Sequence, residues 1–281
     1  MKIRLVTDST TNMNEKIKSR FDIVPLSVCF GDEVYVEGKD ITERRFYEML
    51  IESDVVPTTS QPSPEAYMRV FKEAIDAGET VIVITVASNL SGTYQSANIA
   101  AMEFPEGSVY VVDSKNVAIG AGVLAEYAVR LVDSGMDVNK IVEKLEEERD
   151  KVILVALLDT LEYLKKGGRI SKTAAFAGDM LSIKPVAAVE DGEIKLLGKA
   201  RGSKKGNNLL VQEIEKSGGV DFEKPVLLGY TGLNDDLLQK YIADSSSLWE
   251  GNVDELPVSL VGSVVGTHAG PGAVAVAYFK K

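Results

Sequence analysis

The chain has 281 residues, of which 45% are hydrophobic and 26% are charged, and its formal net charge is −11 at pH 7. This composition is typical of a soluble globular protein, and the length is enough to bury a large core and to divide into two domains. The negative charge argues against nucleic acid as a partner, because phosphate contacts need clustered Lys and Arg, and it disfavours docking on anionic membranes.

Predicted strands and helices alternate through the first half of the chain. The strands are apolar runs, and the helices carry apolar residues at helical spacing. We expect strands at residues 2–7, 22–28, 80–86 and 108–113, and helices at residues 12–20, 42–53, 63–78, 91–103 and 118–135. The run at 80–86 is typical of a strand buried in a parallel sheet. This series predicts a three-layer α/β/α domain at residues 1–150 with a mainly parallel sheet.

The second half of the chain has a different pattern. A charged helix is expected at 138–151, and an Asp-Gly turn predicts a hairpin at 184–200. Further strands are expected at residues 152–158, 225–232, 256–267 and 273–279. Residues 151–281 are therefore predicted to form a second α/β domain with a mixed sheet.

Three predicted loops are rich in small polar residues, at 57–64, 87–97 and 264–274. The second loop follows the buried strand 80–86, and ligands of open parallel sheets gather at such carboxyl ends. The helix that starts near Ser91 and Gly92 offers backbone N–H groups that suit an anion. Helix capping alone would also explain Ser91, and it is the commoner role of serine at such a position.

His268 is the only histidine, and it lies in GTHAGPG, which we interpret as a glycine-rich loop between two strands. A neutral imidazole there could donate one hydrogen bond to a carboxylate, although a lone histidine is more often simply packed. One histidine and one cysteine, Cys29, exclude an internal disulfide and make a zinc site improbable.

The common nucleotide-binding, metal-binding and hydrolase motifs are absent from the sequence. It contains no Walker A spacing, no G-x-G-x-x-G, no H-E-x-x-H and no G-x-S-x-G. We expect no cofactor and no metal. A small-molecule hydrolase or acyl transferase that uses Ser91 and His268 stays open as an alternative.

Basic residues gather at 165–172 and 198–206 in an otherwise acidic chain. Both stretches could be solvated loops. For Arg169, which follows a predicted helix, we favour a role in binding phosphate, in an interdomain contact or in docking a partner. The N-terminal residues predict a strand and not a signal peptide, and no apolar run reaches the ~18 residues of a membrane span. We expect a cytoplasmic protein without stable membrane insertion.

Taken together, six segments in this order resemble the DegV family. They are TDST (7–10), PTTSQPSP (57–64), SNLSGTYQSA (88–97), GGRIS (167–171), ARGSKKG (200–206) and GTHAGPG (266–272). They span almost the whole chain, which makes the resemblance far more specific than any single motif.

The resemblance implies a carrier that holds a long-chain fatty acid between two α/β domains and has no catalytic residues of its own. Such a protein presents the lipid to a separate ATP-dependent fatty acid kinase subunit. The kinase converts the fatty acid into an acyl phosphate, which enters phospholipid synthesis. Carried onto this sequence, Thr58 or Thr59, the Ser91–Gly92 turn and His268 would hold the carboxylate, and Arg169 would belong to the face that meets the kinase. A third possibility is a regulatory or scaffold protein whose basic loops bind a partner.

Overall fold

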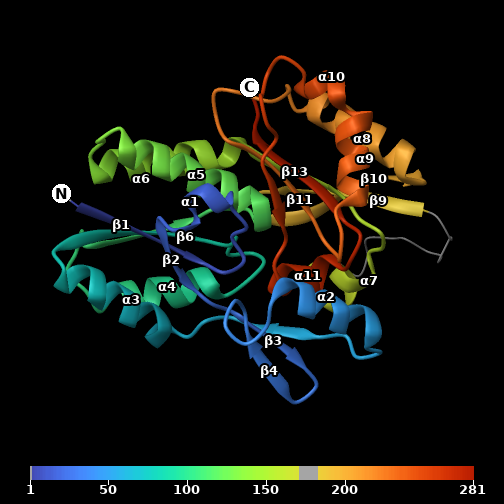
Figure 1. Ribbon diagram of the computed structural model, residues 1–281. Helices are drawn as coiled ribbons and strands as arrows, with labels where there is room; N and C mark the ends of the chain where they lie inside the picture. Colours follow the sequence, from blue (N-terminus) through green and yellow to red (C-terminus); the bar gives the residue numbers. More distant parts are fainter. Residues whose placement is uncertain (1, 171–182) are drawn as a thin grey trace.

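The computed structural model describes residues 2–170 and 183–281, and its elements lie in layers (Figure 1). The first half of the chain forms a wholly parallel sheet in the order β2-β1-β6-β7. Its strands are β1 (Lys2–Asp8), β2 (Phe21–Val24), β6 (Glu79–Thr85) and β7 (Val109–Asp113). Every residue of β6 is buried, as expected for an apolar strand that is covered on both faces.

Helices cover both faces of this parallel sheet. They are α3 (Pro64–Asp76), α4 (Thr93–Ala101), α5 (Ala118–Asp133) and α6 (Val138–Glu148). The pair α3 and α4 lies on one face, and the pair α5 and α6 lies on the other (Figure 1). Alternate residues of β6 serve the two layers, since Val81 packs with Tyr67 of α3 and Ile82 packs with Leu124 of α5. The predicted three-layer α/β/α arrangement is confirmed.

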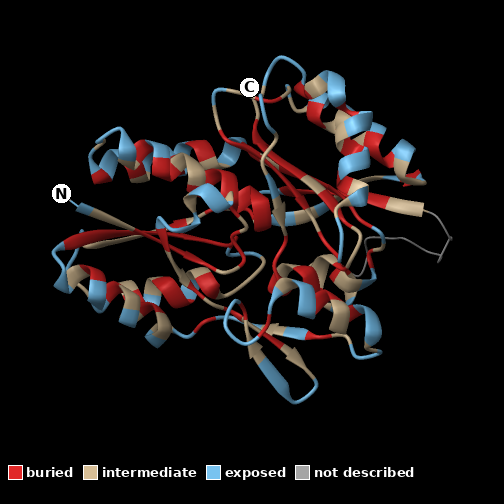
Figure 2. Cartoon of the chain, viewed as in Figure 1, coloured by how far each residue is buried: buried red, intermediate tan, exposed pale blue. Residues whose placement is uncertain are grey.

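The second half of the chain forms a six-stranded mixed sheet in the order β10-β9-β8-β13-β11-β12. Its strands are β8 (Val152–Leu157), β9 (Ile183–Glu190), β10 (Glu193–Arg201), β11 (Val226–Tyr230), β12 (Val258–Leu260) and β13 (Val274–Phe279). Its helices are α8 (Ser203–Lys216), α9 (Asp236–Asp244) and the short α10 (Ser246–Trp249). One face packs on α8 and α9, and the other packs on α5. Helix α5 therefore lies between the two sheets, and Figure 2 shows it buried along much of its length.

A third, small antiparallel sheet has the order β4-β3-β5. Its strands are β3 (Ser27–Phe30), β4 (Glu33–Val36) and β5 (Thr58–Ser60). Helices α2 (Glu43–Glu52) and α11 (Ser263–Ala269) pack against it, with Val28, Phe46, Tyr47 and Val264 in one apolar cluster. The sheet therefore brings residues from the beginning and the end of the chain together.

Two predicted strands differ from the structure. The prediction of a strand at 256–267 is wrong beyond Leu260, because residues 263–269 form α11. The predicted strand 22–28 is two strands in different sheets, β2 and β3, separated at Pro25, which has no N–H to donate to a ladder.

Loops and helix bounds also differ from the predictions. The predicted helix at 12–20 shortens to α1 (Glu15–Lys18). The basic stretch 198–206 is not a loop, since it covers the end of β10 and the start of α8. The predicted 184–200 hairpin is confirmed, and its turn residues Asp191 and Gly192 both have positive φ.

The two halves of the chain share one core. Leu5 and Ile82 of the parallel sheet belong to the same apolar cluster as Leu154 and Phe279 of the mixed sheet. A division into domains at residue 150 stays a prediction. None of the helices in the described ranges has the length and apolar character that crossing a membrane requires. The remaining short elements are η1 (Arg149–Lys151) and α7 (Glu162–Lys166).

Candidate functional site

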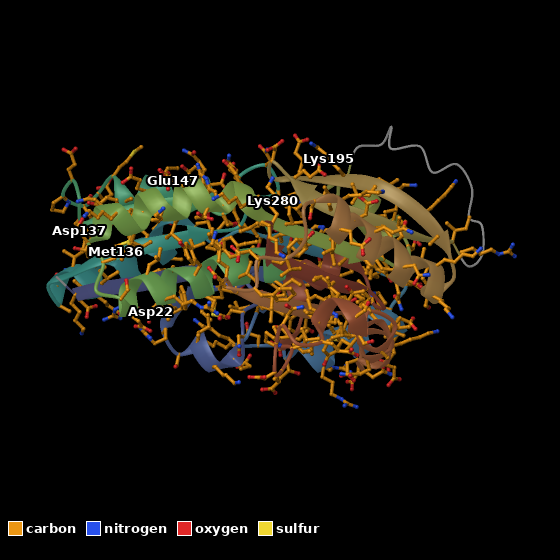
Figure 3. All side chains as sticks on the ribbon, turned by 90° about the horizontal axis from the view of Figure 1, so that it is seen from above. Asp22, Met136, Asp137, Glu147, Lys195 and Lys280 are labelled. Carbon is orange, nitrogen blue, oxygen red and sulfur yellow. The ribbon has the colours of Figure 1, made fainter. Side chains whose placement is uncertain are left out.

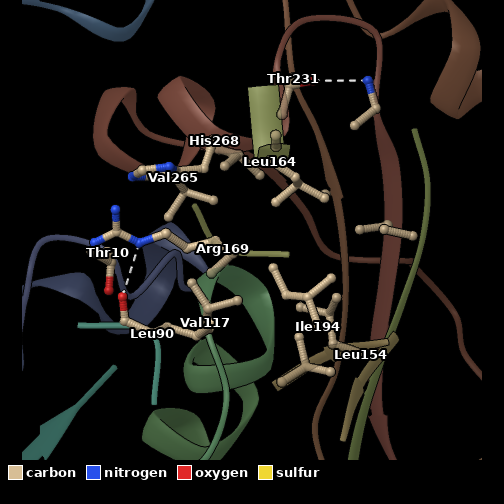
Figure 4. Close-up of a pocket in the computed structure, with 18 of the residues that line it drawn as sticks. Thr10, Leu90, Val117, Leu154, Leu164, Arg169, Ile194, Thr231, Val265 and His268 are labelled. Carbon is tan, nitrogen blue, oxygen red and sulfur yellow. Dashed lines mark hydrogen bonds between the residues drawn. The ribbon is translucent and has the colours of Figure 1, made fainter. Parts of the chain in front are cut away.

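A cavity opens between the carboxyl end of the parallel sheet and the α5-facing side of the mixed sheet (Figure 4). Thr10 and Leu90 reach it from the segments after β1 and β6, Val117 from the start of α5, and Leu154 from β8. The space between the side chains is about 960 Å³, its open mouth included. Pockets for small molecules are mostly apolar. The expectation that ligands gather at the carboxyl ends of these strands agrees with this position.

Four small residues form a row across the floor of the cavity. Strand register places Ala187 of β9 opposite Ala156 of β8, Ala156 opposite Ala275 of β13, and Ala275 opposite Gly229 of β11. All four line the cavity. Because their side chains are so short, the sheet surface leaves space for an apolar ligand. The alternation of small and large residues in GAVAVAYF (272–279) was a sequence signal of part of this row.

Several polar side chains gather on one side of this mostly apolar cavity. Thr59, Ser91, Arg169 and His268 all line it. Figure 4 shows His268, Arg169 and Thr10 on one side and Leu154 and Ile194 on the other. The structure therefore brings together side chains from four distant segments, namely β5, the loop before α4, the segment after residue 166 and α11.

Thr59 and His268 are in direct contact. Thr59 Oγ1 lies 3.0 Å from His268 Nε2, at hydrogen-bonding distance. Thr58 does not line the cavity and is exposed, whereas Thr59 is half-buried. The reason is that neighbouring side chains of a strand point to opposite faces, and both residues lie in β5. Of the two candidate threonines, the geometry favours Thr59.

His268 lies on α11 and not in a loop, which corrects the interpretation of GTHAGPG. Burial, together with the nearby charge of Arg169, lowers the pKa of His268 to about 4, so its imidazole is neutral at pH 7. Its Nδ1 is buried and has no hydrogen-bond partner within the described ranges. That atom lies against Gly167, where a Cβ would come within 2.2 Å of it. The ring is thus fixed between Gly167 and Thr59.

Ser91 and Gly92 precede α4 but have different surroundings. Ser91 Oγ lies 2.8 Å from Thr93 Oγ1 and accepts a weaker bond from the Thr93 N–H at 3.3 Å. Gly92 does not line the cavity, and its carbonyl accepts a hydrogen bond from Gln61 Nε2 at 3.2 Å. A side chain at Gly92 would collide with Gln61, at 2.2 Å. Gln61, which the sequence did not single out, therefore joins the first polar loop to the second.

The structure gives the hydrolase alternative no direct support. Ser91 and His268 line the same cavity, but each has another partner, Thr93 and Thr59 respectively. A nucleophile is normally activated by a base within hydrogen-bonding reach. Among the described residues, no group of His, Cys, Asp and Glu side chains is arranged to hold a metal ion.

Arg169 forms part of the cavity wall. Its Nε donates to the Leu90 carbonyl at 3.1 Å and its Nη1 to the Gly167 carbonyl at 2.8 Å. The half-buried guanidinium thus connects its own segment with the loop before α4. Its predicted role in docking a partner stays a prediction. Ser171, the last residue of the GGRIS segment, lies outside the described residues.

Asp8 and Thr10 are functional candidates to which the sequence analysis gave no role. Asp8 is fully buried and accepts hydrogen bonds from Thr10 Oγ1 at 2.5 Å, from Thr10 N at 3.0 Å and from Val86 N at 2.8 Å. Burial raises the pKa of Asp8. Because the Thr10 hydroxyl donates to Asp8, it presents only acceptor lone pairs to the cavity. The TDST motif was the available signal for this pair.

Comparisons with known proteins agree across the whole chain. The family model described as "Uncharacterised protein, DegV family" matches residues 2–281. A DegV domain-containing protein of Caldanaerobacter subterraneus subsp. tengcongensis is 35% identical over 283 residues, which cover 100% of this chain and 99% of the relative.

Solved structures of similar proteins give the same result. A DegV family protein from Thermus thermophilus, described by its fatty acid binding, has a TM-score of 0.88 and 33% identity, and covers 99% of this chain and 100% of its own. A fatty acid (stearic acid)-binding protein from Eubacterium ventriosum has a TM-score of 0.86 and 27% identity, with 100% and 99% covered. The combination of one parallel sheet and one mixed sheet in this chain matches these structures.

Proposed function

This chain belongs to the DegV family, and from that premise we propose that it is a carrier which binds a long-chain fatty acid. The carboxylate lies at Thr59, Ser91 and His268, and the acyl tail occupies the apolar cavity. The observation that carries this proposal is the gathering of Thr59, Ser91, Arg169 and His268 in a cavity whose lining is otherwise mostly apolar. The fatty-acid-binding descriptions of similar structures support it.

Burial of the acyl tail supplies the driving force for binding. Each buried methylene contributes about 0.8 kcal/mol, so a sixteen-carbon chain yields on the order of 10 kcal/mol before costs. Ordering of the chain and association remove a good part of that gain. The small-residue row Ala187, Ala156, Ala275 and Gly229 provides the surface on which the tail lies.

The head group requires hydrogen-bond donors, because a buried carboxylate without partners is costly. The hydroxyls of Thr59 and Ser91 and the neutral imidazole of His268 are suited to supply them. Arg169 adds a positive charge at the same wall. The hydroxyls and the imidazole are neutral donors and Arg169 is only half-buried, so the carboxylate is held without a fully buried ion pair and is left able to react.

The reaction that follows belongs to a separate protein. The carrier presents the carboxylate to an ATP-dependent kinase, one carboxylate oxygen attacks the γ-phosphate, and acyl phosphate and ADP are formed. The absence of a Walker A or G-x-G-x-x-G motif from the sequence agrees with a carrier that has no ATP site. A cytoplasmic location, Arg169 on the docking face and use of the product in phospholipid synthesis are parts of this proposal.

Native mass spectrometry of gently purified protein tests fatty acid binding. We expect a population heavier than the apoprotein by the mass of a long-chain fatty acid, which organic extraction removes and added palmitate restores. Ligand-free protein that also fails to take up palmitate would contradict the proposal. Kinase presentation is tested separately: ADP release should require ATP, fatty acid, this chain and the kinase together, and release without this chain would reject it.

A further inference from the structure

Glu37 is a buried acidic residue that lies away from the cavity wall, directly after β4. Only 8% of its surface is exposed. Its Oε1 accepts a hydrogen bond from Ser263 Oγ at 2.8 Å and another from the backbone N–H of Val264 at 2.9 Å. Ser263 and Val264 are the first residues of α11. A carboxylate from the small sheet therefore caps the helix that carries His268, where the helix dipole also favours negative charge.

The residues just before α11 are fixed to the same part of the molecule. Gly262 packs so closely on Glu37 that a Cβ would come within 2.5 Å of Oε1. The hydroxyl of Tyr47 in α2 donates a hydrogen bond of 2.8 Å to the carbonyl of Val261. The start of α11 is thus held by two buried side chains from the segment that contains β4 and α2.

The small sheet also carries the other partner of the head-group pair. Strand β3 pairs with β4, which leads directly into Glu37, and with β5, in which Thr59 lies opposite Val28. One sheet therefore sets the position of Thr59 directly and the position of His268 through Glu37 and α11. The hydrogen bond of 3.0 Å between Thr59 and His268 depends on both connections.

We propose that Glu37 is a positioning residue of the carboxylate-binding site, which fixes α11 so that the imidazole of His268 meets Thr59. Its relevance to a fatty acid rests on the proposed function, whereas its effect on His268 does not. Burial of a carboxylate is costly, and the hydrogen bonds that Oε1 accepts from the start of α11 offset part of that cost. An apolar residue in its place could not cap the helix.

The single histidine of this chain allows a direct test. In ligand-free protein labelled with ¹⁵N-histidine, every imidazole signal comes from His268. We expect the wild type and Glu37→Gln to titrate with the same low pKa, because glutamine keeps an acceptor oxygen for Ser263 and Val264. In Glu37→Ala the pKa of His268 should rise towards its ordinary value of about 6.5, because the ring moves away from Gly167 and becomes more exposed to water.

Palmitate affinity is the second measurement. It should fall about tenfold in Glu37→Ala, as expected for the loss of a charge-assisted hydrogen bond, and stay within about twofold of the wild type in Glu37→Gln. Glu52→Ala, which removes an exposed glutamate at the end of α2, is the matched control and should change neither measurement.

Two results would overturn the positioning role. One is a folded Glu37→Ala protein whose His268 signals match the wild type, whatever its affinity. The other is a Glu37→Gln protein with signals as altered as those of Glu37→Ala. If Glu37→Ala does not fold, Ser263→Ala is measured instead. A smaller rise in the pKa of His268 supports the positioning role, and imidazole signals that match the wild type reject it. If wild-type protein binds no palmitate, the proposed function fails, and the titration still tests Glu37.

Discussion

Thr59 and His268, which are 209 residues apart in the sequence, are joined at 3.0 Å through Thr59 Oγ1 and His268 Nε2. This contact connects the small sheet with the C-terminal helix α11 at the wall of an apolar cavity. It also places two potential donors where one carboxylate could accept a hydrogen bond from each of them.

The neighbouring threonines of β5 offer a matched pair of variants. Thr59→Val keeps the shape of the side chain but removes its hydroxyl, and we expect it to weaken palmitate binding about tenfold through the loss of a hydrogen bond to a charged group. Thr58→Val should bind normally, because Thr58 is exposed and does not line the cavity. Competition binding with a fluorescent fatty acid measures both. Equal affinities of the two variants would refute the assignment of Thr59.

Gly167 is predicted to be necessary for the orientation of His268. Gly167→Ala places a methyl group 2.2 Å from Nδ1 and must displace the ring. We expect weaker fatty acid binding, by about fivefold or more, as the bond from the ring to Thr59 is lost. Gly198→Ala is the control, because its methyl meets only Leu209 Cδ2, at 3.1 Å. Unchanged binding in Gly167→Ala would show that the orientation of the ring does not matter.

Burial of His268 predicts a pH dependence of stability. Its folded pKa of about 4 lies below the unfolded value of about 6.5, so the unfolded chain binds the proton first as the pH falls. The free energy of unfolding should therefore be constant above about pH 6.5 and fall between pH 6.5 and 4, by at most about 3 kcal/mol from this group. Urea unfolding of the wild type and His268→Gln at several pH values isolates this contribution. If the free energy of unfolding has the same pH dependence in both proteins, His268 makes no such contribution.

The small-residue row predicts where the tail lies. Ala275→Leu fills part of the floor between Ala156 and Gly229. We expect the affinity for palmitate to fall about tenfold, because about two methylenes, worth about 0.8 kcal/mol each, are no longer buried. The affinity for a chain a few carbons shorter should fall less. Ala243→Leu, on the exposed surface of α9, controls for the added bulk. An equal loss of affinity for every chain length would indicate that the tail does not lie on this row.

Much of the fold could be predicted because several of its central strands are buried on both faces. The apolar runs of β6 and β8 and the small residues of α5 indicate central positions directly. The helix α11 could not be recognised, because LPVSLVGSVVGT has the β-branched residues and glycines of a strand. It is helical because Gly266 allows close packing on Phe46 and Tyr47, and because Glu37 caps its start. Both are tertiary contacts, which local sequence does not encode.

The candidate site, too, could be predicted only in part from the sequence. Thr59, Ser91, Arg169 and His268 could be named from their loops and from the family resemblance. The choice of Thr59 over Thr58 required the strand alternation of β5, which a loop interpretation hides. Gln61 and Gly167 lie in segments that carry the family resemblance, but they act, like Glu37, through contacts with residues 31 or more positions away. Local sequence does not show such contacts.

A crystal structure of the palmitate-loaded protein would show where the ligand lies. We expect the carboxylate within hydrogen-bonding distance of the side chains of Thr59, Ser91 and His268, with the tail along Ala156 and Ala275. Electron density that places the carboxylate away from these three side chains, or a cavity without lipid at saturating palmitate, would contradict this expectation.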